Sequence, residues 1–266
     1  MSGHAARHPI MAAMSGRKFP QPPSLLTRVA RFAGISWHLA DGLLTAAFRF
    51  PFYSEARRTR AIRHWSAVLL RRLGVRLHVE GELHAGRPLM LVANHVSWLD
   101  IFAVNAVQPV RFVAKSEIRR WPAIGWLCEK TGTLFIERGR RADAGRVNRL
   151  TAEALRAGDV IAVFPEGTTS NGAQVLRFHS ALLQPALLAD AVVQPVAIRF
   201  ERVDGTLCVE AAYDGDKNLL QSIGDIISQP RIDARLCILP PLPEQADRRA
   251  LANAAQAAIV NRLPSP

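Results

Sequence analysis

Short apolar runs alternate with amphipathic stretches along the chain from residue 75 onward. Runs of apolar, β-branched residues predict strands, and stretches with an apolar position every three or four residues predict helices. The predicted strands are 75–79, 89–93, 111–114, 134–136, 160–164, 192–200, 207–212 and 232–239. The predicted helices are 97–107, 141–157, 180–191, 216–228 and 244–262. This alternation predicts an α/β fold with a largely parallel, mixed sheet flanked by helices.

The first 74 residues have a different pattern. Residues 1–23 are polar and contain prolines, so we expect a flexible leader there. Residues 24–53 are apolar, but charges at Arg31, Asp41 and Arg49 interrupt them. A spanning helix needs about 20 predominantly apolar residues. The pattern therefore favours a segment that lies in a membrane interface over one that crosses the bilayer.

Residues 56–73 predict a basic amphipathic helix. Ile62, Trp65, Leu69 and Leu73 recur at helical spacing, arginines occupy much of the remainder, and Gly74 is a C-cap candidate. Such a helix can dock on anionic lipid, or it can be an ordinary surface helix packed on the domain. We favour docking on lipid, because this helix directly follows the apolar segment 24–53, which also suits a membrane interface. The predicted organisation is a leader (1–23), a membrane-associating helical segment (24–74) and the domain that carries the chemistry (75–266).

Composition and charge restrict the class of partner. The chain is 49% hydrophobic, which excludes disorder as its main state. Its formal net charge is +12. Residues 1–80 hold thirteen Lys and Arg against three acids, so the excess lies in the first third. An anionic partner is expected: nucleic acid, a membrane surface or a phosphorylated substrate. The cysteines are far apart, which suggests neither a disulfide framework nor a zinc site and fits a reducing compartment.

The residues Asn-His-Val-Ser-Trp-Leu-Asp at 94–100 directly follow a predicted buried strand. Ligand sites of parallel sheets lie at the carboxyl ends of the strands. His95 and Asp100 can form a general-base pair, in which the carboxylate orients the imidazole. Five residues on one helix would separate the two side chains by about 140°. The pair is therefore possible only if His95 precedes the helix and Asp100 reaches back from its first turns; otherwise His95 is a capping residue.

Two further motifs follow predicted strands. Phe-Pro-Glu-Gly-Thr-Thr-Ser at 164–170 combines a proline, a glycine and three hydroxyls, and such a turn can present backbone N–H groups and Glu166 to a polyol or phosphate. The run 135–141 places arginines in a loop, where they suit bidentate contact with phosphate or carboxylate. Taken alone, each of these motifs is also compatible with a plain turn.

Together these motifs resemble the glycerolipid acyltransferase family, which includes bacterial 1-acylglycerol-3-phosphate acyltransferases. The resemblance covers about residues 75–200. It rests on five fragments in order: Asn-His-Val-Ser-Trp-Leu-Asp at 94–100, Ala-Lys-Ser-Glu-Ile at 114–118 followed by Pro122 and Gly125, Gly-Thr-Leu-Phe-Ile-Glu-Arg at 132–138, the motif at 164–170, and Val-Val-Gln-Pro-Val-Ala-Ile at 192–198.

The resemblance implies transfer of a fatty acyl group from acyl-CoA or acyl carrier protein to the hydroxyl of a lysolipid. His95 would be the base and Asp100 would orient it. The substrate-binding residues implied in the same way are Lys115, Arg138, Glu166, Gly167 and Thr168, with Arg138 on the acceptor's phosphate. No metal or redox cofactor is implied. Direct attack by the acceptor, without an acyl-enzyme, agrees with the lack of a Gly-x-Ser-x-Gly motif.

One departure leaves the acceptor open. Where relatives commonly have Arg-Phe-Lys and a small residue, this chain has Arg177-Phe178-His179-Ser180. The missing lysine removes a cation, and lyso-ornithine lipid, whose headgroup offers a carboxylate, becomes an alternative to lysophosphatidic acid. We favour lysophosphatidic acid at this point. Attachment to the cytoplasmic face of a bacterial inner membrane is expected.

Two other classes of protein are alternatives. A nucleic-acid-binding protein is disfavoured, because the basic residues interleave with lipid-suited apolar ones. A non-catalytic lipid-binding relative is also disfavoured, because His95, Asp100 and Glu166 are all present.

Overall fold

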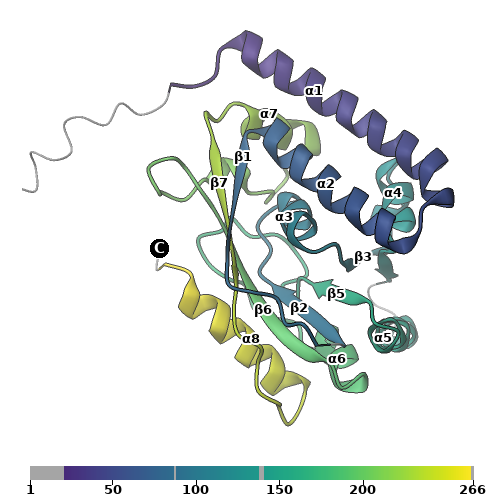
Figure 1. The fold of residues 1–266 in the computed structure, drawn as a ribbon. Helices are drawn as coiled ribbons and strands as arrows, with labels where there is room; N and C mark the ends of the chain where they lie inside the picture. The colour runs from purple at the N-terminus through teal and green to yellow at the C-terminus, as the bar shows by residue number, and fades with distance from the viewer. Residues whose placement is uncertain (1–20, 87, 138–140, 265–266) are drawn as a thin grey trace, which may run out of the picture.

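The computed structural model describes residues 21–86, 88–137 and 141–264 (Figure 1). In these residues seven strands form one sheet in the order β1-β7-β6-β2-β5-β3-β4. The strands are β1 (Val75–Glu80), β2 (Leu89–Ala93), β3 (Arg111–Lys115), β4 (Leu134–Ile136), β5 (Val160–Val163), β6 (Val192–Glu201) and β7 (Ile232–Ile238). All pairs are parallel except β6 with β7, so β1 and β7 run opposite to the other strands. The predicted mixed, largely parallel sheet is confirmed.

Helices cover both faces of the sheet (Figure 1). One face packs against α2 (Glu55–Leu73), α3 (Leu99–Val107) and α7 (Leu219–Ile227), and the other against α5 (Arg141–Arg156), α6 (Gln184–Leu188) and α8 (Arg248–Arg262). The short α4 (Ile124–Lys130) follows β3 and a 3₁₀ turn. The central strands β2 and β5 are buried along their whole length because both of their faces are covered.

The N-terminal helices lie on the α2 side of the sheet. The helix α1 (Leu25–Leu44) continues through a π turn (Thr45–Arg49) and a 3₁₀ turn (Phe50–Phe52) into α2. The predicted leader falls largely on residues 1–20, which lie outside the described residues. Leu69, Leu70 and Leu73 of α2 are buried in the main core, so α2 packs as part of the domain. The domain boundary at residue 74 stays a prediction.

Polar contacts tie α1 to the domain. The imidazole of His38 stacks on Trp65 with 4.6 Å between ring centroids. The Trp65 indole N–H donates to the His38 carbonyl at 3.1 Å, and the His38 ring bonds the Trp65 carbonyl at 2.9 Å. Arg31 donates to the carbonyls of Ile227, the last residue of α7, and of Gln229 and Pro230 after it. Ile35 of α1 is buried in the core, and many of the other apolar residues of α1 are exposed.

Capping decides where two helices begin. The predictions 216–228 and 244–262 start too early, since α7 begins after Asn218 and α8 after Asp247. The Asn218 side chain forms a capping box with Gln221, and the Asp247 carboxylate accepts two backbone N–H groups of the first turn. The predicted helix 180–191 is a 3₁₀ turn followed by the five residues of α6.

The predicted strand 207–212 is wrong. Leu207 forms only an isolated bridge with Glu201, and a 3₁₀ turn (Val209–Ala211) follows. The edge of β6 that this strand would extend along is already occupied. The Asn94 side chain accepts from the backbone N–H of Ile198 at 2.8 Å and donates to its carbonyl at 2.9 Å. A side chain from the end of β2 therefore replaces the strand that the apolar pattern suggested.

Candidate active site

The candidate site lies where β2 and β5 end, at the carboxyl edge of the sheet. Asn94 directly follows β2, and its two bonds to β6 hold the start of the loop in place. His95 comes next, in the loop before α3. Parallel strands bring the end of β5 beside the end of β2, because Val92 pairs with Val163. The motifs at 94–100 and 164–170 are therefore neighbours.

His95 and Asp100 form the pair that the sequence suggested. The distance from His95 Nδ1 to Asp100 Oδ2 is 2.8 Å. Asp100 stands in the first turn of α3, and the same Oδ2 accepts the backbone N–H groups of Val96 at 2.7 Å and Ser97 at 2.9 Å. The chain thus folds back over the carboxylate, which resolves the unfavourable five-residue spacing.

The pair has a buried end and an accessible end. The Asp100 side chain is 0% exposed, whereas that of His95 is 19% exposed. With a carboxylate as its acceptor, Nδ1 carries the ring proton and Nε2 is the nitrogen left to take another. Among the described residues, no hydroxyl or thiol bonds the imidazole of His95. The arrangement therefore suits a base that acts on an incoming hydroxyl rather than on an enzyme nucleophile.

Glu166 lies behind the histidine. Its Oε1 accepts the backbone N–H of His95 at 2.7 Å, and its Oε2 accepts that of Leu176 at 2.9 Å. Only 3% of Glu166 is exposed. Burial raises the pKa of this carboxyl to about 7, against the lowering effect of its two backbone bonds. Through its two backbone hydrogen bonds, the Glu166 side chain links the loop after β2 to the segment after the Phe-Pro-Glu-Gly turn.

An aromatic stack holds the imidazole from one side. The ring of Phe164 lies parallel to that of His95 with 4.1 Å between centroids, and Phe112 stacks on Phe164 at 5.7 Å. The backbone N–H of Ser170 donates to the His95 carbonyl at 2.9 Å. Sequence reasoning missed this role of Phe164. The signal available was an aromatic residue at the end of a buried strand, directly before the Phe-Pro-Glu-Gly turn.

The remaining predicted residues lie around this edge, with one exception. Lys115 is half-buried at the end of β3, Gly167 has a φ of 68°, and Thr168 is exposed. His179 is exposed, and its backbone N–H donates to the carbonyl of Pro165 at 2.8 Å. Arg138, together with most of the predicted arginine loop, falls outside the described residues.

The described residues contain neither a candidate metal cluster nor a candidate membrane span. No group of three or more His, Cys, Asp and Glu side chains in this part of the chain could hold a metal ion. None of the helices described is both long enough and apolar enough to cross a bilayer.

Comparisons with known proteins place the chain among enzymes. The family model described as Acyltransferase matches residues 74–199. A lyso-ornithine lipid O-acyltransferase of Pseudomonas aeruginosa is 41% identical, over 88% of this chain and 92% of that protein. A 1-acyl-sn-glycerol-3-phosphate acyltransferase of Neisseria meningitidis is 38% identical, over 67% of this chain and 73% of that protein.

A solved structure has the same fold. It is the crystal structure of the 1-acyl-sn-glycerophosphate acyltransferase of Thermotoga maritima, which aligns with a TM-score of 0.68 and 21% identity over 89% of this chain and 93% of that one. At this level of identity the likeness concerns the fold alone.

Proposed function

The chain belongs to the acyltransferase family, and on this basis we propose that it transfers a fatty acyl group from an acyl thioester to the hydroxyl of a lysolipid. The observation that carries the proposal is the His95–Asp100 pair at the carboxyl edge of the sheet, in which Nδ1 is bonded to the carboxylate and the imidazole is partly exposed. The pair stands in the segment that the family model matches.

The pair supports a direct transfer. Nε2 of His95 takes the proton of the acceptor hydroxyl as the oxygen attacks the thioester carbonyl. The imidazolium that results is stabilised by the buried carboxylate of Asp100, one oxygen of which accepts three hydrogen bonds. As the tetrahedral intermediate collapses, the carbon–sulfur bond breaks and the proton passes from His95 to the leaving thiolate. An ester and a free thiol are formed, and the chemistry balances without a metal or redox cofactor.

Two groups position the base. Glu166 fixes the backbone N–H of His95, and Phe164 fixes the plane of its ring. Since both oxygens of Glu166 are engaged by backbone N–H groups, we assign it to positioning and not to direct contact with the acceptor. We keep Lys115, Gly167, Thr168 and Arg138 as substrate-binding residues, with Arg138 on the anionic headgroup of the acceptor.

Lyso-ornithine lipid is the acceptor that we put first. The Pseudomonas aeruginosa relative, which matches over 88% of this chain and 92% of its own length, bears that activity in its name. So does a Brucella abortus relative that is 38% identical over 74% of its length. The absence of the lysine at His179 agrees with this choice. Lysophosphatidic acid, which the sequence motifs favoured, is the second candidate, because the Neisseria meningitidis relative bears that name.

Acyl transfer by purified protein tests the proposal. The assay offers lyso-ornithine lipid and lysophosphatidic acid in parallel, each with acyl-CoA and with acyl carrier protein as donor, and His95→Ala is the control. We expect product from the ornithine acceptor that falls by a factor of roughly 10² to 10⁴ in His95→Ala. Product from lysophosphatidic acid alone would reverse the order of acceptors. Transfer that persists in His95→Ala would remove the histidine from the mechanism.

We also propose that the protein attaches peripherally to an anionic membrane, on the cytoplasmic face of a bacterial inner membrane. The outer side of α1 and the turns after it is apolar, with these side chains exposed: Leu25, Leu26, Val29, Phe32, Trp37, Leu44, Phe48 and Phe52. Such a surface suits the boundary between lipid headgroups and acyl chains.

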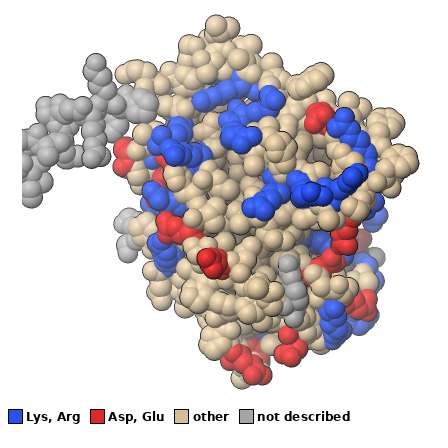
Figure 2. All heavy atoms as spheres, in the orientation of Figure 1, with Lys and Arg blue, Asp and Glu red and all other residues tan. Residues whose placement is uncertain are grey.

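The charge of α1, α2 and β1 supports the same attachment. In the described residues, no arginine between 28 and 76 forms an ion pair. These arginines are Arg28, Arg31, Arg49, Arg57, Arg58, Arg60, Arg63, Arg71, Arg72 and Arg76. Figure 2 shows basic side chains gathered over the upper part of the face that α1 and α2 cover. Each arginine near an anionic membrane contributes about 1 kcal/mol to binding.

A further inference from the structure

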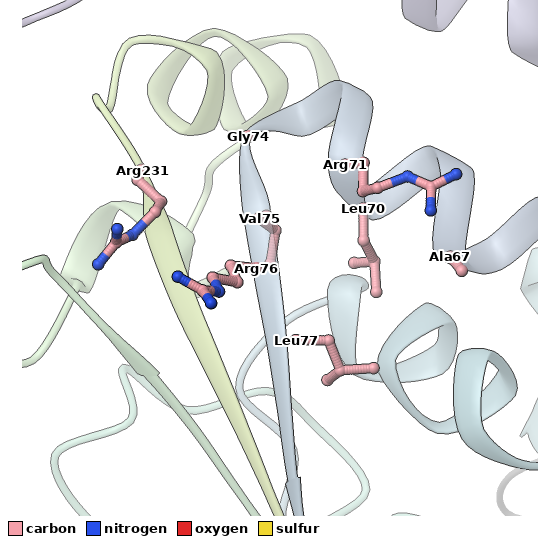
Figure 3. Close-up of a pocket in the computed structure, with 8 residues that line it drawn as sticks. All are labelled: Ala67, Leu70, Arg71, Gly74, Val75, Arg76, Leu77 and Arg231. Atoms are coloured by element: carbon pink, nitrogen blue, oxygen red, sulfur yellow. The ribbon is translucent and has the colours of Figure 1, made fainter.

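A cavity with basic walls lies apart from the candidate active site. It has a volume of about 430 Å³ and opens where α2 ends and β1 and β7 begin (Figure 3). Its lining residues are Ala67, Leu70, Arg71, Gly74, Val75, Arg76, Leu77 and Arg231. None of them belongs to the site around His95. Three arginines and no acid line the cavity, so it suits an anion.

Two of these arginines lack an anionic partner. Arg76 lies opposite Asp233 in the sheet register, which would normally pair them. The Asp233 carboxylate is already taken, because Oδ1 bonds His78 at 2.8 Å and Oδ2 accepts from Arg231 at 2.8 Å. Neither Arg76 nor Arg71 has a side-chain hydrogen bond or ion pair with any described residue.

The guanidinium groups of Arg76 and Arg231 are placed to share a ligand. Figure 3 shows those of Arg76 and Arg231 beside one another on the same side of β1, while Arg71 extends along α2. Neighbouring like charges repel each other. An anion bound between the two guanidinium groups attracts both of them and offsets this repulsion. A phosphate oxygen pair matches the fork of a guanidinium, which can donate two parallel hydrogen bonds to it.

A smaller cavity lies beside this one, next to α1. A Cβ on Gly74, which lines the first cavity, would lie 2.9 Å from the guanidinium of Arg31. Arg31 and Arg72 line the smaller cavity, of about 290 Å³, between α1 and α2. We call the two cavities together the basic groove. On α1 the exposed Leu26 and Val29 are next in sequence to Thr27 and Ala30, which line this groove.

From this juxtaposition we propose that the basic groove binds the phosphodiester headgroup of one anionic phospholipid, whose acyl chains lie along the outer side of α1. A free phosphate would use the arginines but not the apolar surface beside them, so the lipid explains both features. The proposal deepens the membrane attachment proposed above. It adds a lipid-binding site that is separate from the one where the acceptor reacts.

A calorimetric titration of the full chain tests the site. The ligands are dihexanoyl phosphatidylglycerol, kept below its micellar concentration, and inorganic phosphate. The variants are Arg76→Gln and, as a matched control, Arg249→Gln. Arg249 is an exposed arginine on α8, across the sheet from the groove, and its side chain forms no ion pair with the described residues. Both substitutions remove one positive charge from the surface.

We expect one lipid to bind per chain, with inorganic phosphate much weaker. Loss of a charge-assisted bidentate contact in Arg76→Gln should weaken lipid binding by a factor of about 10 to 100, and Arg249→Gln should change it by less than about twofold. Binding of inorganic phosphate as tight as that of the lipid would overturn the lipid assignment. No lipid binding, or equal binding by Arg76→Gln and the wild type, would overturn the site.

The titration contains no acyl donor, so it separates this proposal from the proposed function. A wild-type chain that transfers acyl groups but binds no lipid in the titration contradicts the groove alone. A chain that binds the lipid at the groove but transfers no acyl group contradicts the proposed function alone.

Discussion

Asp100→Asn is the substitution that probes the candidate base most directly. In the wild type one oxygen, Oδ2, accepts three hydrogen bonds, from His95 Nδ1 and from the backbone N–H groups of Val96 and Ser97. An amide can satisfy the two backbone donors only by placing its carbonyl oxygen at that position. His95 Nδ1 then keeps an acceptor, and Nε2 stays free to take a proton. The amide nitrogen takes the place of Oδ1, which has no partner among the described residues.

The substitution therefore removes charge and leaves geometry in place. A hydrogen bond to a charged group contributes about 1.5–3 kcal/mol and a neutral one about 0.5–1.5 kcal/mol. Two unit charges about 4 Å apart interact by about 4 kcal/mol at an effective dielectric constant of 20, which sets the upper limit. We take a loss of roughly 1.4–2.7 kcal/mol in stabilisation of the imidazolium, which corresponds to a fall in kcat of about 10- to 100-fold.

The assay is steady-state acyl transfer with the acceptor and donor that the wild type uses, and circular dichroism checks the fold of each variant. His95→Ala provides the rate without the base. We expect Asp100→Asn to fall between the wild type and His95→Ala, with little change in the KM of either substrate. A folded Asp100→Asn as slow as His95→Ala would refute the reasoning, since it would mean that the amide flips and gives the wrong tautomer. An unchanged kcat would show that the charge of Asp100 contributes nothing.

Three further predictions concern pH, packing and membrane binding. Burial raises the pKa of Glu166 to about 7 from an ordinary 4.5, so the stability that the protonated group contributes is present below pH 4.5 and is lost as pH rises through 7. In urea denaturation the free energy of unfolding of the wild type should fall by about 3 kcal/mol over this window relative to that of Glu166→Gln. The same dependence of unfolding free energy on pH in both proteins would contradict the shift. A Cβ on Gly125 would lie 2.2 Å from a backbone carbonyl of the preceding 3₁₀ turn. Gly125→Ala should therefore lower the free energy of unfolding by about 1–3 kcal/mol and the Tm by several degrees. An unchanged Tm would show that the turn shifts to accommodate the methyl group without loss of stability. Trp37→Glu with Phe48→Glu should reduce flotation with anionic vesicles, whereas Val260→Glu, at an exposed apolar position on α8, should not. An equal loss of flotation in both variants would place the membrane-binding surface elsewhere.

Local pattern was sufficient for most of the fold. The apolar run at 89–93 and the short run at 134–136 coincide with β2 and β4, because each is bounded by polar or turn-forming residues. The strand expected at 207–212 failed for a reason that no window of sequence contains. Its place on β6 is taken by the side chain of Asn94, more than a hundred positions earlier in the chain.

In the candidate site, too, the local sequence predicted some features and the tertiary structure decided others. The motif at 94–100 identified His95 and Asp100 as a possible pair. The motif at 164–170 identified Glu166, and the resemblance to a family implied that it binds substrate. That Glu166 bonds the backbone of His95, and that Phe164 stacks on its ring, depends on β2 and β5 being neighbours in the sheet. Strand order is decided by how the whole core packs, so these contacts were outside the reach of periodicity.

By itself the sequence determined the element types, the mixed α/β class, the excess of positive charge near the N-terminus and the motifs of an acyltransferase. These properties follow from residue type and spacing over a few positions. Only the tertiary structure decided which groups compete for the same partner. Asp233 serves His78 and Arg231, and Arg76 is left without an acid although it lies opposite Asp233 in register. A hydrogen-bonding group can pair only with the groups that the fold brings within reach. Those groups come from distant parts of the chain, so local sequence does not identify them.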